Sequence, residues 1–186
     1  MGSTAPKVFD EGFESGIAFP AYVRKVDRAS HWRGRDDDTE DKRVEHIISR
    51  VFPNADGGVS VFLVKCETDL ARVSIGLNSG RSSRSERLLL LWVKAEELCD
   101  AGLNVVQAPG DTSCDHANRR HYNIHYNKEA LVTVALRLVS ADRDIVTLTK
   151  GKMRQIVNYG ESIGCRATET KLPSCLCKDA ADHMSL

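Results

Sequence analysis

Short apolar runs that alternate with helical stripes between residues 44 and 158 constrain the fold of this chain more than any other feature. The runs VSVFLVK (Val59–Lys65) and LLLLWV (Leu88–Val93) have the length of strands, and such continuous apolar runs are typical of strands buried on both faces. Between them, Leu70, Val73 and Leu77 recur at helical spacing and predict a helix from about Glu67 to Asn78, which Gly80 ends.

Further short runs predict strands at Asn104–Gln107 and Ile145–Leu148, and Asn127 is predicted to cap a helix between them. The alternation in HYNIHY, residues 121–126, predicts a strand with His121 and His125 on one face. This alternation of strands and helices predicts an α/β fold, a single-domain sandwich in which helices flank a mostly parallel sheet.

The same patterns divide the chain into three parts. Residues 1–35 form an irregular segment with a possible edge strand at Phe19–Val26, because Pro20 stands near its start, where a missing N–H does least harm. Residues 36–160 form the predicted α/β domain, with Thr39 capping its first helix and Thr149 its last. Beyond Gly160 the periodicity fades, so residues 161–186 are predicted to be a loosely held, cysteine-containing tail.

Composition limits the classes of partner. Lysine and arginine total 26, as do aspartate and glutamate, so no overall field attracts a polyanion, and no strong DNA-binding signal is present. A local patch at Arg81, Arg84 and Arg87 would have to supply any such binding. No run approaches the roughly 18 apolar residues of a membrane span, and the N-terminus does not resemble a secretory leader. We therefore expect a cytoplasmic protein without membrane contact, with mostly reduced thiols.

The stretch PGDTSCDHANRRHYNIHY, residues 109–126, concentrates the side chains suited to chemistry. It holds a cysteine, three histidines and two adjacent arginines, whereas ordinary loops favour Gly, Ser and Pro. On a parallel sheet, this stretch would emerge with Lys65–Thr68 and Lys94–Glu96 at the edge where α/β proteins bind ligands. We predict a polar pocket there, lined by Asp111, Cys114, His116, Arg119, Arg120, His121, Asn123 and His125.

Acid/base chemistry on a phosphodiester is one use of these groups. His121 and His125 would exchange protons with the attacking and leaving oxygens, while Arg120 would hold the phosphate oxygens. The string RHYNIH, residues 120–125, resembles the Arg-x4-His motif of HEPN-type ribonucleases. Those folds are helical bundles with the motif on a helix, so the resemblance implies roles for Arg120 and His125 only if this segment is helical.

Other uses of the same residues remain open. Cys114, Asp115 and His116, with His121 and His125, include zinc-ligand types, but a strand would hold the two later histidines roughly 13 Å apart. The tail offers a second candidate zinc set: Cys165, Cys175, Cys177 and His183. Cys114 could also act as a thiol nucleophile, with His116 or His121 as base and Asn118 or Asp111 to orient it. The stretch could equally be a polar loop with turn hydrogen bonds.

The resulting hypothesis is a pocket that binds an anionic, phosphate-bearing ligand, either a small molecule or RNA. The protein would be a metal-independent phosphodiester or RNA hydrolase if it is an enzyme at all. No Walker loop, Gly-x-Ser-x-Gly motif or nuclease Glu-x-Lys strand is present, and we expect no cofactor. The first alternative is a non-catalytic protein-interaction or regulatory module, which could use the loop from Arg81 to Arg84. The second is a zinc-binding protein.

Overall fold

The structure, a computed structural model, describes residues 15–26, 39, 41–45, 58–78, 86–100, 102–108, 110, 112, 114–125 and 145–162. The strands within this part of the chain are β1 (Ala21–Val26), β2 (Gly58–Val64), β3 (Leu88–Lys94), β4 (Asn104–Gln107), β5 (His121–His125) and β6 (Ile145–Leu148). The helices are α3 (Glu67–Asn78), α4 (Ala95–Asp100), α5 (Asp115–Arg119) and α7 (Lys150–Ser162).

These six strands form one sheet in the order β4-β5-β2-β1-β3-β6, and every neighbouring pair is antiparallel. The prediction of a mostly parallel sheet is therefore wrong. β2 and β3 do run in the same direction, as a strand–helix–strand unit requires, but β1 lies between them and pairs with both. The stretch with the clustered histidines joins β4 to β5 as an antiparallel pair instead of leading to another parallel strand.

The strand predicted at Phe19–Val26 exists as β1, but its place in the sheet differs from the prediction. It pairs along its whole length with β3 and over its first half with β2, so it is a central strand and not an edge strand. Ala21 and Val23 are completely buried, which suits this central position. Pro20 is tolerated because it precedes the strand, so the sheet ladder loses no N–H donor.

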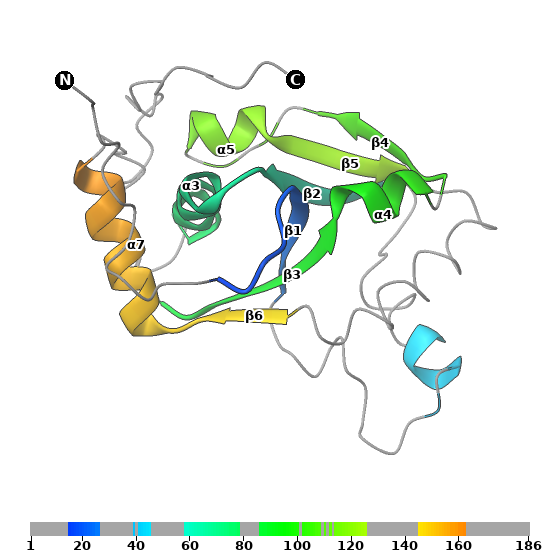
Figure 1. Cartoon of the computed structure of the whole chain (residues 1–186), viewed down its shortest axis with the longest axis horizontal. Helices are drawn as coiled ribbons and strands as arrows, with labels where there is room; N and C mark the ends of the chain where they lie inside the picture. Colours follow the sequence, from blue (N-terminus) through cyan, green and yellow to red (C-terminus); the bar gives the residue numbers. More distant parts are fainter. Residues whose placement is uncertain are drawn as a thin grey trace.

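Side chains pack on both faces of the sheet. One apolar cluster contains Val23, Phe62 and Leu90 with residues of α3, α5 and α7. The second contains Val61, Leu91 and Ile124 from the opposite face, together with Leu98 of α4. Figure 1 shows the same arrangement, with α3 between α5 and α7 on one side of the sheet and α4 on the other.

The helix α3 has the bounds that its apolar spacing predicts, but it is more enclosed than predicted. It packs against β2, α5 and α7, and nine of its 12 residues are buried, including the charged Asp69 and Arg72. Leu77, which the spacing places inward, is only partly buried. Enclosure on three sides therefore brings polar residues of α3 into the interior.

The two predicted helix caps are confirmed. The Lys42 N–H donates to Thr39 Oγ1 at the start of a helix described over residues 41–45. At the start of α7, the Lys152 N–H donates to Thr149 Oγ1. The helix predicted after Asn127 lies wholly outside the described residues. So does the predicted tail 161–186, except for its first two residues, which belong to α7. Within the described part of the chain, no helix is both long and apolar enough to cross a membrane.

Candidate functional site

The segment that joins β4 to β5, residues 108–120, lies at one end of the sheet, where strands end, and we name it the β4–β5 connection. β2, β3 and β4 all run toward this end, because each is antiparallel to a common neighbour, β1 or β5. The segments that follow these three strands therefore lie at the same end of the sheet, which is antiparallel and not parallel as predicted. α5 lies within this connection and contacts α3.

The β4–β5 connection is held in shape by Asn118. Its Oδ1 accepts from the Thr112 N–H at 2.8 Å and from Thr112 Oγ1 at 2.7 Å, while its Nδ2 donates to the Thr112 carbonyl at 2.8 Å. Gly110 lies so close that an added Cβ would be 2.7 Å from Asn118 Oδ1. These contacts resemble the turn hydrogen bonds of the polar-loop interpretation, and they fix the position of α5.

Four charged or polar side chains meet where α5 packs on α3, and we name this set the α3–α5 cluster: Asp69, Arg72, His116 and Arg120. Asp69 Oδ1 lies 3.2 Å from His116 Nε2 and 3.0 Å from Arg120 Nη2. Arg120 Nε lies 2.9 Å from the same ring nitrogen, and Arg72 Nη1 lies 3.1 Å from His116 Nδ1. The cluster thus joins the β4–β5 connection to the central helix.

Asp69 is the anionic centre of the α3–α5 cluster. It is in the first turn of α3, where the helix dipole favours a carboxylate, and its Oδ2 accepts from the Lys65 N–H at 2.9 Å. Burial by itself would raise the pKa of Asp69, but the hydrogen bonds from His116 and Lys65 and the charge of Arg120 outweigh it. The pKa therefore lies below its ordinary value of 3.8.

The ring of His116 cannot satisfy every donor that surrounds it. A guanidinium only donates, and a neutral imidazole has one donor and one acceptor nitrogen. With the hydrogen on Nε2, the ring donates to Asp69 and accepts from Arg72, but the Arg120 Nε–H then faces another hydrogen. The other tautomer satisfies Arg120 Nε and leaves Arg72 facing a hydrogen. Either way, one guanidinium N–H has no acceptor on the ring.

Arg72 carries the buried charge that the cluster does not balance. Arg72 as a whole is only 5% exposed, and its side chain forms no ion pair with any described residue. Its Nε is buried and has no hydrogen-bond partner among those residues. A buried guanidinium normally has a carboxylate or phosphate partner, because the desolvation of an isolated charge is costly. Within the part of the chain that the structure describes, Arg72 therefore lacks the anionic partner that such a buried charge normally has.

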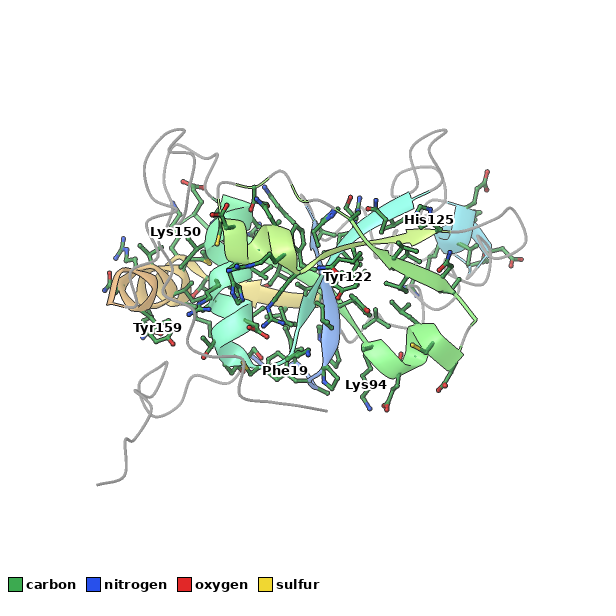
Figure 2. The ribbon with its side chains drawn as sticks, turned by 90° about the horizontal axis from the view of Figure 1, so that it is seen from above. Phe19, Lys94, Tyr122, His125, Lys150 and Tyr159 are labelled. Carbon is green, nitrogen blue, oxygen red and sulfur yellow. The ribbon has the colours of Figure 1, made fainter. Side chains whose placement is uncertain are left out.

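The other predicted site residues are not brought into this cluster. His121 is buried, with its ring in an edge-to-face contact with the Phe62 ring and its Nδ1 3.1 Å from the Ala108 carbonyl. His125 is exposed and pairs with Gly58, at the end of β2 opposite to α3. Figure 2 shows His125 toward the end of β5 that lies away from α7.

Three further predicted residues have local roles, and one lies outside the described part of the chain. Asn123 is half-buried, and its Oδ1 accepts from Ser60 Oγ at 3.3 Å. Cys114 is completely buried in an apolar cluster at the start of α5, where its thiol does not face solvent. Arg119 is exposed, and its carbonyl accepts from Gln107 Nε2. Asp111 falls outside the described residues.

The structure bears on the ribonuclease-like motif and on one of the two candidate zinc sets. Residues 121–125 form the strand β5, so the condition for carrying the HEPN roles to Arg120 and His125, a helix through this segment, is not met. No group of three or more His, Cys, Asp or Glu side chains within the described residues is arranged to hold a metal ion. The tail cysteines and the loop from Arg81 to Arg84 lie outside the described residues.

Sequence reasoning identified two members of the α3–α5 cluster, His116 and Arg120, and missed Asp69 and Arg72. The two missed residues stand three positions apart on a helix, a spacing that is also common for ion pairs on exposed helix faces. Their burial depends on α5 packing against α3, and the five-residue helix α5 gives no periodic signal in the sequence. No local pattern could therefore have singled them out.

Comparison of the whole chain with protein-family models, curated proteins and solved structures finds no match.

Proposed function

We propose that this protein binds a phosphate-bearing anion at the α3–α5 cluster. One observation carries the proposal: the guanidinium of Arg72 is buried without an ion-pair partner among the described residues. Arginine is the side chain best suited to phosphate, because its planar fork donates two parallel hydrogen bonds to neighbouring oxygens. An anion would supply the acceptor that the cluster lacks.

The charge and hydrogen-bond balance of the cluster supports this proposal. Two guanidiniums face one carboxylate, so positive charge exceeds negative charge when His116 is neutral. Arg120 is the member nearest to solvent, with a side chain 18% exposed, whereas the Asp69 side chain is 6% exposed. An arriving anion would therefore meet Arg120 first. When His116 carries its hydrogen on Nε2, the tautomer that donates to Asp69 and accepts from Arg72, the Nε–H of Arg120 has no acceptor on the ring and is available to the anion.

Binding, and not turnover, is the proposed function. His116 is the imidazole within the cluster, and both of its ring nitrogens already lie within 3.2 Å of protein groups. A general acid or base needs a ring nitrogen within hydrogen-bond reach of the reacting atom. His121 and His125 stay candidates for catalysis only as a prediction from the sequence, since neither contacts the cluster in its present arrangement.

Titration of inorganic phosphate at constant ionic strength tests the proposal. We expect Arg120→Gln to weaken phosphate binding by about tenfold or more, because a charge-assisted hydrogen bond contributes about 1.5–3 kcal/mol. The Gln side chain keeps a donor near Asp69 but removes the positive charge. Isothermal calorimetry gives the dissociation constant, and circular dichroism confirms that the variant is folded.

Arg154→Gln is the matched control, since Arg154 is an exposed arginine on α7 and is not a member of the α3–α5 cluster. It removes the same charge from the protein, so a general electrostatic effect would weaken binding to the control and to Arg120→Gln alike. Equal dissociation constants for Arg120→Gln and Arg154→Gln, or no phosphate binding by the unaltered protein, would refute the proposed function.

A further inference from the structure

We infer that the ligand presents a terminal phosphate group, a phosphate monoester, and not the internal phosphodiester of a nucleic-acid backbone. This inference rests on the proposed function and concerns the chemical class of the ligand. It follows from two features of the α3–α5 cluster, the depth at which its donors lie and the directions from which they approach, and from the charge of the chain as a whole.

The depth of the donors limits what can reach them. Arg72 and His116 are 5% and 8% exposed, and Arg120 alone among the basic side chains of the cluster reaches the surface appreciably. A phosphodiester carries a substituent on both sides of its phosphorus, so both substituents would have to fit around a buried guanidinium. A monoester carries one substituent, and its other side can enter the protein while the rest of the ligand stays in solvent.

The direction of the donors favours a group with several unsubstituted oxygens. Arg72 and Arg120 approach the His116 ring from opposite nitrogens, Nδ1 and Nε2. A single group that serves both guanidiniums therefore needs acceptors that point in different directions. A monoester has three unsubstituted oxygens and up to two negative charges, whereas a diester has two such oxygens and one charge. Each additional oxygen paired with a guanidinium adds a charge-assisted hydrogen bond.

The charge of the chain as a whole argues against a polymer. A protein that follows a nucleic-acid backbone usually presents several basic side chains along an electropositive surface. This chain carries as many acidic as basic residues, and the cluster offers one partly exposed guanidinium. The end of a ligand suits this arrangement better than a continuous run of phosphates.

Three small probes separate the contributions of charge and shape. Methyl phosphate is the monoester, dimethyl phosphate is the diester, and methyl sulfate has the single charge of the diester with the three unsubstituted oxygens of the monoester. We expect methyl phosphate to bind about tenfold or more tightly than dimethyl phosphate, with methyl sulfate in between. Hexauridylate with a 5′-phosphate should likewise bind more tightly than hexauridylate without one.

The outcomes distinguish this inference from the proposed function. If dimethyl phosphate binds as tightly as methyl phosphate, or both hexauridylates bind equally, and Arg120→Gln weakens that binding, the monoester inference is overturned while the proposed function stands. If none of the probes binds, or Arg120→Gln binds them as the unaltered protein does, the proposed function fails and the inference fails with it. Arg154→Gln again serves as the control for net charge.

Discussion

Asp69→Asn is expected to lower the free energy of unfolding by about 3 kcal/mol, because it removes the buried carboxylate that pairs with Arg120 and lies against His116. Asparagine has nearly the same shape and keeps an oxygen that can accept from the Lys65 N–H, so the loss reports the charge and not a cavity. Chemical denaturation measured by circular dichroism gives the change. Asp100→Asn, at an exposed position of α4, should change the unfolding free energy by no more than about 0.5 kcal/mol.

The pH dependence of unfolding provides an independent check on Asp69. Its pKa in the folded protein lies below the ordinary value of 3.8, so its contribution to stability is fully present above that value. The contribution is lost as the pH falls through the lower folded-state pKa, because the unfolded chain then binds a proton more readily. The unaltered protein should therefore lose more stability than Asp69→Asn over this acidic range. Parallel pH profiles for the two proteins would contradict the role assigned to Asp69.

Gly76→Val is expected to lower the free energy of unfolding by about 3 kcal/mol, near the upper end of the range for overpacked interiors. A Cβ at this position of α3 would lie 3.0 Å from Ala117 Cβ, 3.1 Å from Cys114 Cβ and 3.2 Å from Thr112 Oγ1. Valine adds two further methyl groups to that contact, so α5 has to move away from α3. Thermal and chemical denaturation measure the loss.

A matched substitution on α7 controls for the general effect of valine in a helix. Among the described residues, a Cβ at Gly151 meets only Thr149 Oγ1, at an ordinary contact distance of 3.8 Å. Gly151→Val should therefore change stability by less than about 1 kcal/mol. Because α5 carries His116, Gly76→Val should also weaken phosphate binding at the α3–α5 cluster. Similar stability losses in the two variants would contradict the close α3–α5 packing described above.

The local elements of this fold could be predicted from the sequence, because their signals are local. Apolar spacing and the following glycine give the bounds of α3, and the short β-branched runs give β4 and β6 as the structure has them. Thr39 and Thr149 cap helices for the same reason: a hydroxyl just before a helical stripe accepts a backbone N–H.

The order of strands in the sheet could not be predicted in the same way. A strand–helix–strand pattern fixes the relative direction of β2 and β3, but it does not say whether another strand lies between them. Pairing of β1 with both is a long-range choice, and its apolar run looks like that of an edge strand because Pro20 precedes it. One inserted strand converts two parallel neighbours into an antiparallel sheet.

The candidate site was predicted in part, for a similar reason. Residue types drew attention to the stretch that contains His116 and Arg120, and the structure shows that these two contact each other. Alternation along β5 placed His121 and His125 on one face, yet one of them packs on Phe62 and the other is exposed. The charged residues of α3 enter the site only through tertiary packing, which no short pattern encodes.

The stability of Arg72→Met, measured with and without inorganic phosphate at constant ionic strength, tests the central claim most directly. Methionine fills a similar space without the charge, so we expect the free energy of unfolding without phosphate to stay equal or rise by about 1 kcal/mol. Phosphate should then stabilise the unaltered protein and leave Arg72→Met unchanged, since only a state that binds the ligand gains stability from it. A loss of several kcal/mol without phosphate, together with equal stabilisation of both proteins by phosphate, would show that Arg72 is a structural residue and not a ligand-binding one.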